Sequence, residues 1–417
     1  MDESTLHAFK TYAHVTEILF STMTSSANME KNGGMILLAG NSHPNLAKLI
    51  SEHLQVPLTD VLCYNKPCRE TEVEIRQSVR AKHVFVLQTS SKDVNNDIWE
   101  AIILIYTCRT SDAKSITAVM PFLPYSMQCC VRRRSALPMK LVADMICKAG
   151  ATHVISLDLY RKEIQGFFGV PVENLRASSF LLHYICCNIP DYRNAVIVAK
   201  NPKIMHKATS FAEKLRLSIA VIHGEVKDDD MSEDNESFSS FFDKEEFIKT
   251  ERIILHAYRW GDREKMSFIK LFYFNNSSSV TDRKIRNDAS IAQTYDIFQL
   301  KNVKMKPPLT VIGDVGGKIA IIVDNVIDEA QSFIAAAQLL KQRGAYKIYV
   351  IVTHGLLNAD APALLEDSVI DKVIMTNTIP HEMHKLRCHK IETIDISLLI
   401  SDAIRRIYNE ESMAQLY

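Results

Sequence analysis

The chain has 417 residues, of which 47% are hydrophobic and 24% are charged, a balance typical of a globular protein. Lysine and arginine together number 49, as do aspartate and glutamate, so no global charge favours nucleic acid or an anionic membrane as a partner. A chain of this length can form two domains, each with a substantial core.

The cysteines and the first residues bear on the cellular compartment. The nine cysteines include no Cys-x-x-Cys pair, and an odd number fits poorly with a disulfide framework, so we expect reduced thiols. Residues 6–20, LHAFKTYAHVTEILF, contain Lys10, His14 and Glu17 and therefore lack the apolar centre of a signal peptide. No stretch is apolar for long enough to span a bilayer. These features predict a cytoplasmic protein.

From residue 35 onward, β-rich and helical segments alternate. We expect strands over 35–40, 83–89, 115–126 and 151–160, and helices over 43–54, 97–112 and 138–150. The last helix ends at Gly150, a residue type common just after helices. Alternation of this kind predicts a mostly parallel sheet with helices on both faces.

The same pattern restarts near residue 194. Further β-rich runs are expected over 194–200, 218–225, 318–326, 347–355, 371–378 and 390–397. Helical segments over 207–217 and 330–345 lie between them, and an amphipathic helix over 398–412 follows. The restart predicts a second α/β domain of similar design.

The stretch from about 227 to 306 breaks this rhythm. It opens with KDDDMSEDNESFSSFFDKEE, an acidic and serine-rich composition typical of disordered segments. We expect a partly disordered insertion with one ordered element, and we favour a solvated segment over one that recruits a basic partner.

Seven longer phrases are more specific than any short motif. They are RETEVEIRQSVR (69–80), KEIQGFFGVPVENLRAS (162–178), PDYRNAVIVAK (190–200), KPPLTVIGDVGGKIAIIVDN (306–325), RGAYKIYVIVTHGLL (343–357), TNTIPHEMHKLRCHKI (376–391) and DISLLISDAIRRIYNEESMA (395–414). These phrases resemble the ribose-phosphate pyrophosphokinases, or phosphoribosylpyrophosphate (PRPP) synthetases. Within that family the chain is most similar to the synthetase-associated proteins, which are non-catalytic partner subunits.

The resemblance implies an α/β fold of two tandem phosphoribosyltransferase-like domains with mostly parallel sheets flanked by helices. The expected division is an N-terminal extension over 1–34, an N-terminal domain over 35–176, a C-terminal domain over 177–395 and a C-terminal helix over 396–417. The insertion at about 227–306 falls within the C-terminal domain.

The synthetases transfer a pyrophosphoryl group from Mg–ATP to ribose 5-phosphate, and one of their strand-end loops resembles residues 321–333. In the enzymes that loop carries two adjacent carboxylates and a third for the ribose, followed by small residues for the phosphate. Here Asp324 and Asp328 match the first carboxylate of the adjacent pair and the later one, whereas Asn325 stands at the second position of the pair. Ser332 still suits a phosphate, but Glu329 brings a negative charge. The resemblance therefore implies a vestigial ribose-phosphate loop.

The other positions that the resemblance assigns to metal or ATP have also changed. Tyr160 stands where the enzymes have a strand-end histidine, and a phenol is a poor Mg²⁺ ligand. Mg²⁺ and ATP binding is therefore expected to be lost or weak, which leaves no cofactor and no metal. The further degenerate positions are Asn201 for a metal carboxylate, Gly224 and Val226 for the mobile-loop Lys and Arg, Lys66 and Cys68 for adenine-pocket residues, Met127 for an ATP-binding Arg, and Glu70, which is retained.

Three features admit two interpretations each. The arginines 132–134 form either an anion site or a solvated loop, and we favour the loop. His381 and His384 have an i, i+3 spacing but no matched acidic or cysteine partner, which argues against a metal site. Asp324 and Asp328 are either vestigial ribose contacts or caps of the following helix.

The resemblance as a whole implies a non-catalytic regulatory subunit that forms hetero-oligomers with catalytic PRPP synthetase subunits and inhibits PRPP formation for nucleotide biosynthesis. Homo-oligomers remain an alternative, and neither nucleic acid nor a membrane is an expected partner. Residues 162–175 and the apolar side of the C-terminal helix (Ile396, Leu399, Ile400, Ala403 and Ile407) are the expected oligomer surfaces. Two other functions stay open, namely an active ribose-phosphate diphosphokinase and a stand-alone sensor of nucleotides or sugar phosphates.

Overall fold

The structure is a computed structural model that describes residues 34–131, 135–223, 309–358 and 360–416. The arginines 132–134, the insertion at 227–306, Gly224, Val226 and nearly all of the expected N-terminal extension lie outside the described residues. Within the described ranges, no helix combines the length and the apolar character that crossing a membrane would require.

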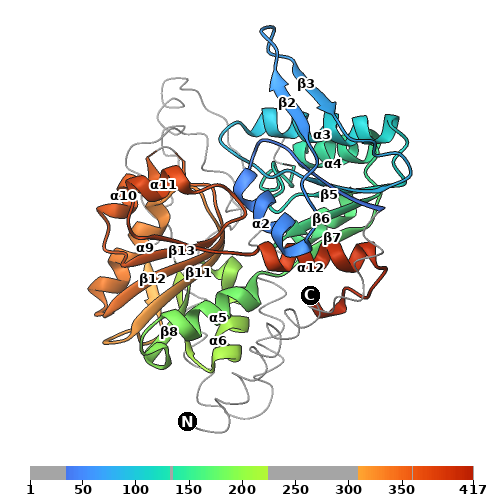
Figure 1. Cartoon of the computed structure of the whole chain (residues 1–417). Coiled ribbons are helices and arrows are strands. Elements are labelled where there is room, and N and C mark those ends of the chain that lie inside the picture. The colour runs from blue at the N-terminus through green and yellow to red at the C-terminus, as the bar shows by residue number, and fades with distance from the viewer. Residues whose placement is uncertain (1–33, 132–134, 224–308, 359, 417) are drawn as a thin grey trace, which may run out of the picture. The chain divides into compact units, whose positions relative to one another are not determined.

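The first sheet has five parallel strands in the order β1–β4–β5–β6–β7 (Figure 1). The expected strand over 115–126 ends already at Val119, because Pro121 and Pro124 lack the N–H that a strand ladder needs. The predicted helix stop is confirmed at Gly150, where φ is 128°. The elements are β1 (Met35–Ala39), α2 (Pro44–Leu54), β4 (His83–Leu87), α3 (Val94–Thr110), β5 (Ser115–Val119), α4 (Pro138–Ala149), β6 (His153–Leu157) and β7 (Val172–Leu175).

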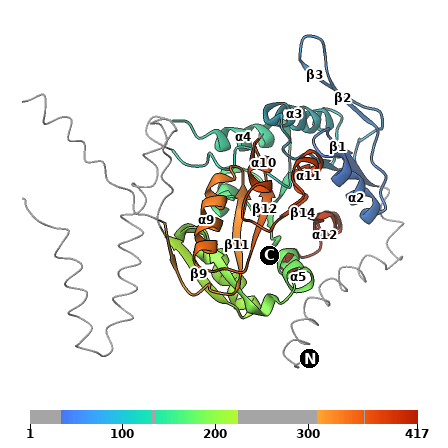
Figure 2. The same ribbon diagram turned by 90° about the vertical axis from the view of Figure 1, so that its left-hand side faces the viewer.

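A two-stranded antiparallel hairpin, absent from the predicted elements, projects from this half of the chain. It consists of β2 (Val61–Asn65) and β3 (Thr71–Ile75) and stands clear of the sheet in both views (Figures 1 and 2). Isolated hairpins are marginal in water, and this one is anchored at its base by Val61, Val73 and Ile75, which pack against the core. The tip, residues 66–70, is exposed.

The second sheet has seven strands in the order β10–β9–β8–β11–β12–β13–β14, all parallel except β10. With the first sheet it confirms the expected α/β class with mostly parallel sheets. The short elements β7, β10, α5, α10 and α11 were not predicted. The elements are α5 (Ser178–Asn188), β8 (Ala195–Ala199), α6 (Met205–Leu215), β9 (Ser218–His223), β10 (Thr310–Ile312), β11 (Ile319–Ile327), α9 (Gln331–Gln342), β12 (Lys347–Gly355), α10 (Ala361–Glu366), β13 (Lys372–Thr376), α11 (Glu382–Arg387), β14 (Ile391–Ile394) and α12 (Ser397–Tyr408).

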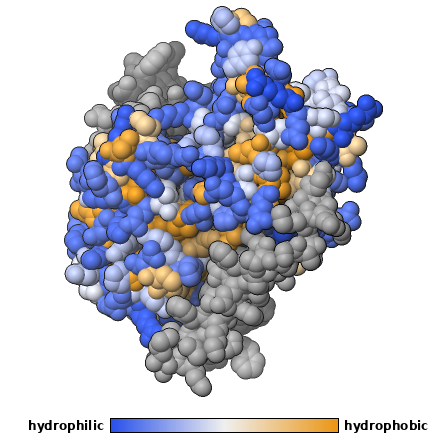
Figure 3. Space-filling model, viewed as in Figure 1, coloured by the Kyte–Doolittle hydropathy of each residue, from blue (hydrophilic) through white to orange (hydrophobic). Residues whose placement is uncertain are grey.

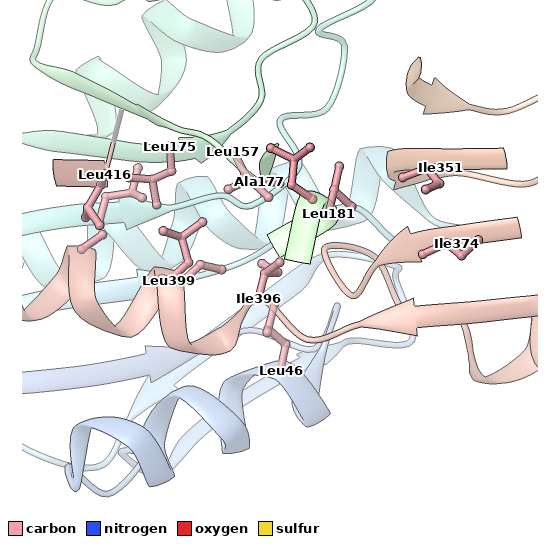
Figure 4. Packing of buried hydrophobic residues seen from close by; sticks show 14 of the residues in the cluster. Leu46, Leu157, Leu175, Ala177, Leu181, Ile351, Ile374, Ile396, Leu399 and Leu416 are labelled. Carbon is pink, nitrogen blue, oxygen red and sulfur yellow. The ribbon is translucent and has the colours of Figure 1, made fainter. Parts of the chain in front are cut away.

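Buried side chains form three hydrophobic clusters. One lies between the first sheet and helices α3 and α4, and another between the second sheet and helices α9 and α10. The largest cluster joins the other faces of both sheets through α2, α5 and α12 (Figure 4). Alternate residues of one strand belong to different clusters, as Leu37 and Leu38 of β1 do, because strand side chains point to opposite faces.

Helix α12 belongs to this shared core and not to an oligomer surface. Ile396, Leu399, Ile400 and Ala403 are between 0% and 3% exposed and pack with side chains of both sheets (Figure 4). The expectation that these four residues contact a partner is therefore wrong, and Ile407, the fifth expected residue, is half-buried and packs against the same cluster. An amphipathic pattern reveals that one face of a helix is covered, but it does not reveal what covers that face.

The expected surface over residues 162–175 is internal only in part, because Lys162, Glu163, Gly166, Gly169 and Pro171 are exposed. Ile164 and Leu175 are fully buried and Phe168 nearly so. On the face seen in Figure 3, hydrophobic side chains occur in separate groups among hydrophilic ones. The apolar pattern of α12 thus reflects packing within the chain, whereas an oligomer surface over 162–175 stays a prediction.

Shortening a core side chain of α12 by one methyl group tests this assignment. Ile404 is fully buried, so Ile404→Val is expected to lower the free energy of unfolding by about 0.5–1.5 kcal/mol. Urea unfolding measures the change. The matched control is Ile312→Val at a 65% exposed position of β10, which is expected to change stability little. Equal losses in the two variants would contradict the assignment of α12 to the core.

Candidate functional site

The candidate site lies where the direction of the second sheet reverses. From β8 the chain proceeds to β9 on one side, whereas from β11 it proceeds to β12, β13 and β14 on the other. Ligands of open α/β sheets bind at such a switch point, outside the carboxyl ends of the strands. The register pairs Ala199 with Val323, which brings the next residues, Lys200 and Asp324, side by side.

Lys200 is the central cation of this site. Its Nζ lies 3.0 Å from Asp324 Oδ2 and donates to Ser332 Oγ at 3.3 Å. The same ammonium stands 3.7 Å from the centroid of the Phe333 ring. The Lys200 and Asp324 side chains are only 17% and 10% exposed, so water screens this ion pair weakly. A side chain of the protein thus provides the positive charge next to the loop carboxylate.

Lys207, on the first turn of α6, is the second cation. Its Nζ donates to the Asp324 carbonyl at 3.0 Å, to Asn325 Oδ1 at 2.7 Å and to Thr353 Oγ1 at 3.1 Å. Burial of the ammonium lowers the pKa of Lys207, while the nearby carboxylates of Asp158 and Asp324 act in the opposite direction. Asn325, at a position where the resemblance implies a carboxylate, therefore serves as a hydrogen-bond acceptor for lysine.

The carboxyl ends of both sheets meet beside these lysines. Thr353 of β12 donates to Asp158 Oδ2 at 2.8 Å, and Asp158 directly follows β6 in the first sheet. Asp158 has a φ of 39°, a left-handed conformation that is costly for a non-glycine residue. Its carboxylate also accepts from the Ala177 N–H at 3.4 Å and lies 3.7 Å from Arg176.

His354 adds a second link between the two sheets. Its Nε2 lies 2.9 Å from the carbonyl of Leu157, an acceptor, so the Nε2–H must donate. Nδ1 then accepts from Thr378 Oγ1 at 2.9 Å. Burial lowers the pKa of His354 to about 4, so the ring is neutral near pH 7. Thr89 completes this contact by donating to the Thr378 carbonyl at 2.7 Å.

Asp324 and Asp328 do not cap the helix that follows them. The N-cap residue of α9 is Ala330, and no side chain caps this helix. Asp324 Oδ1 accepts from the N–H of Asn325 at 2.7 Å. Asp328 is partly buried, and this burial raises its pKa. The capping interpretation is therefore wrong for both residues.

The other sequence-derived positions lie elsewhere. Tyr160 and Met127 are 43% and 41% exposed, in the segments after β6 and β5. Asn201 Oδ1 accepts from the Ile204 N–H at 3.2 Å and so caps the short 3₁₀ turn Pro202–Ile204. Lys66, Cys68 and Glu70 are exposed at the hairpin tip, where Lys66 pairs with Glu72 at 2.7 Å (Figures 1 and 2). The switch point thus contains Asp324, Asn325 and Ser332, but not the hairpin residues.

The residues of this site do not fit Mg–ATP. Mg²⁺ is bound through carboxylate and water oxygens, yet the Asp324 carboxylate is paired with Lys200 and the Asn325 oxygen with Lys207. In the described ranges, no group of three or more histidine, cysteine, aspartate or glutamate side chains is arranged to hold a metal ion. This includes His381 and His384, whose rings lie 5.9 Å apart.

Sequence reasoning assigned no role to Lys200, Lys207, Asp158, Thr353 or His354. For Lys200 a signal was present, since it is the last residue of a predicted strand, just as Asp324 lies near the end of another. Parallel neighbours end at the same sheet edge, so pairing those two strands would have placed the lysine beside the aspartate. For the others the signal lies in contacts between segments distant in sequence, which a residue pattern does not contain.

Comparison with known proteins places this geometry in a family. The model of the phosphoribosyl synthetase-associated domain matches residues 191–265 and 273–417, more than half of the chain. The model of the N-terminal domain of ribose phosphate pyrophosphokinase matches residues 35–150. Phosphoribosyl pyrophosphate synthase-associated protein 2 of Bos taurus is 50% identical over 393 residues, covering 92% of this chain and 94% of that protein.

The chain belongs to the phosphoribosyl pyrophosphate synthase-associated protein family. The chain is also similar to ribose-phosphate pyrophosphokinase 1 of Schizosaccharomyces pombe, with 34% identity over 408 residues that cover 91% of the chain and 98% of the enzyme. Among solved structures it resembles the phosphoribosylpyrophosphate synthetase of Mycobacterium smegmatis, with a TM-score of 0.68, 26% identity, and coverage of 90% and 99% of the two chains. The expected phosphoribosyltransferase-like fold is thereby confirmed.

Proposed function

We propose that this chain is a non-catalytic regulatory subunit that associates with catalytic PRPP synthetase subunits and lowers their formation of PRPP. The observation that carries the proposal is 50% identity, over nearly the whole length, to a protein named for its association with this synthase. The expected site of action is the cytoplasm, where PRPP serves nucleotide biosynthesis.

The arrangement at the switch point supports the absence of catalysis. Phosphoryl and pyrophosphoryl transfer depends on cations that meet the charge developing on the transferred group. Here the ammonium groups of Lys200 and Lys207 are directed to oxygen atoms of the protein itself, at 2.7–3.3 Å. Neither cation is positioned to serve a substrate, and Asp324 is not available to a metal ion.

The overall fold supports association without catalysis. Both sheets and the core between them are complete in this chain, so the fold does not depend on the groups that the enzymes use for chemistry. A subunit with an intact fold and an altered strand-end loop can join an assembly and leave one of its sites inactive. Inhibition then follows when active subunits depend on their neighbours.

The test is co-expression with the active synthetase of the same organism. We expect the two chains to co-purify and elute as one species, and the complex to form PRPP more slowly per active subunit than the synthetase alone. The isolated chain is expected to form no PRPP from ATP and ribose 5-phosphate. Independent elution of the two chains, or an unchanged rate in the complex, would refute the regulatory role.

The 34% identity to a pyrophosphokinase favours one alternative function, an active ribose-phosphate diphosphokinase. The same assay separates the two functions, because product formed by the purified chain alone, at a rate that scales with its concentration, supports the enzyme and excludes the proposal. A variant such as Asp324→Asn then serves to exclude a contaminating synthetase, since it removes the loop carboxylate from this chain only.

A further inference from the structure

Lys200 provides the positive charge that pairs with the carboxylate of Asp324. The residue directly follows β8, and its side chain reaches across to β11 and the first turn of α9. One ammonium group meets a carboxylate at 3.0 Å, a hydroxyl at 3.3 Å and the face of an aromatic ring at 3.7 Å. All three partners, Asp324, Ser332 and Phe333, come from residues 324–333.

We propose that Lys200 is a built-in counter-ion that closes the loop at residues 324–332 to divalent cations and to the sugar phosphates or polyphosphates that such cations accompany. The side chain takes the place of a bound cation, so the loop carries its positive charge permanently. This inference goes beyond the regulatory role, because it concerns ligand exclusion in the isolated chain and holds with or without a partner.

The charge balance of the site explains the closure. A nearly buried carboxylate is costly unless a positive charge accompanies it, and Asp324 is nearly buried. Lys200 meets that need, and the Phe333 ring adds a cation–π contact that favours the same position of the ammonium. A divalent ion entering here would meet Lys200 directly and Lys207 close by, and it would have to displace Lys200 first.

Lys200 and Lys207 differ in which groups lose a hydrogen-bond or charge partner when the lysine is replaced. Lys207 binds a backbone carbonyl, an amide oxygen and a threonine hydroxyl, so it serves the protein framework. Lys200 binds the Oδ2 atom of Asp324, whereas Oδ1 is already held by the Asn325 N–H. Removing Lys200 therefore frees one carboxylate oxygen at the strand end and leaves the framework contacts in place.

The experiment compares the wild-type chain with Lys200→Met, which removes the charge but keeps an unbranched apolar stem, and with Lys200→Arg, which keeps the charge. Mn²⁺ alone is the probe, and its free concentration is followed by electron paramagnetic resonance. We expect Lys200→Met to take up about one Mn²⁺ per chain near millimolar concentrations, as expected for a site with few carboxylate ligands. Wild type and Lys200→Arg are expected to take up none there.

The double variant Lys200→Met/Asp324→Asn is the matched control. It removes the carboxylate that the proposal assigns to the metal, so the uptake gained in Lys200→Met is expected to disappear. Thermal unfolding gives a second readout, since Mn²⁺ should raise the midpoint of Lys200→Met and not that of the wild type. The proposal is overturned if the wild type binds Mn²⁺ as Lys200→Met does, or if Lys200→Met gains no binding.

A measurement on the unmodified protein guards against a variant that does not fold. Acylation of amines by acetic anhydride, followed by peptide mass mapping, compares Lys200 with the exposed Lys214 of α6. Lys200 is expected to react about tenfold more slowly, because its amine must first leave a nearly buried ion pair. The rate should not change with added Mg²⁺. Equal rates for the two lysines, or a Lys200 rate that Mg²⁺ increases, would overturn the proposal.

Discussion

Replacing Lys207 with methionine is expected to lower the free energy of unfolding by about 3–5 kcal/mol, the usual cost of removing one partner from a buried charge network. The change deprives the Asp324 carbonyl, Asn325 Oδ1 and the Thr353 hydroxyl of their shared donor. It also removes a positive charge that acts on Asp158. Urea unfolding followed by circular dichroism measures the loss.

Lys214→Met is the matched control for this prediction. Lys214 lies two turns further along the same helix, α6, and is exposed, so its loss should change stability by no more than about 0.5 kcal/mol. If both variants unfold at the same urea concentration, the hydrogen bonds from Lys207 to Asp324, Asn325 and Thr353 do not contribute to the stability of the fold. Asp158→Asn in the Lys207→Met background should then recover none of the stability, whereas the present geometry predicts partial recovery.

Acidification should destabilise the protein through two buried histidines. Burial lowers the pKa of His354 and of His381 from an ordinary 6.5 to about 4 in each case. Between these pH values the unfolded chain binds more protons than the folded chain, so stability falls as the pH falls. The stabilising effect is complete above pH 6.5 and is lost toward pH 4. From pH 7.5 to pH 4.5 we expect a loss of roughly 3–5 kcal/mol from the two rings together.

The surroundings of the two rings differ in charge. Asp158 and Lys207 face His354 with opposite signs, while His43, His384 and Lys385 around His381 all oppose its protonation. His381 Nε2 donates to the Gly355 carbonyl at 2.9 Å, so the hydrogen of the neutral ring is on Nε2. Protonation would add a charge at Nδ1, which is buried and has no hydrogen-bond partner.

Variants separate the two histidines from the carboxyl groups that titrate nearby. His381→Gln should lose about half of the pH dependence, although it also lowers stability at pH 7.5. His206→Gln, at an exposed position of α6, should leave the wild-type dependence intact. Burial raises the pKa of Asp97, Glu100 and Asp328, so protonation of these carboxyl groups stabilises the folded state as the pH falls, opposite to the effect of the histidines. This contribution is the same in all the variants. A pH dependence unchanged in His381→Gln would refute the assignment.

Much of the fold could be read from the sequence because the strands are buried on both faces and separated by amphipathic helices. Long apolar runs such as that of β12 and turn residues such as Gly150 carry this information locally. The hairpin β2–β3 escaped prediction because its residues are only half-buried, so apolar character is weak there. The partner of α12 escaped because amphipathicity does not specify which surface covers a helix.

At the site, the sequence predicted the altered loop but not its new contacts. The changed residues Asn325 and Glu329 were visible as residue types, and their positions toward and just after the end of β11 followed from the predicted strand. That Lys200 and Lys207 converge on Asp324 depends on the pairing of β8 with β11, which joins residues more than one hundred positions apart in the chain. The capping role proposed for Asp324 and Asp328 failed for a different reason, since β11 continues to Ile327 and α9 begins only after Ala330, too far along the chain for either side chain to be the N-cap.

The burial of α12 has a consequence for how the protein is made. This helix is synthesised after every strand of both sheets, yet it supplies part of the core beneath the first of them. During translation the side chains of Leu37 and Phe85 therefore lack part of their core packing, because the α12 residues of the same cluster have not yet been synthesised. Nascent chains of this protein should bind chaperones until synthesis passes Ile404, and premature stop codons shortly before α12 should yield aggregates instead of a truncated but folded first half.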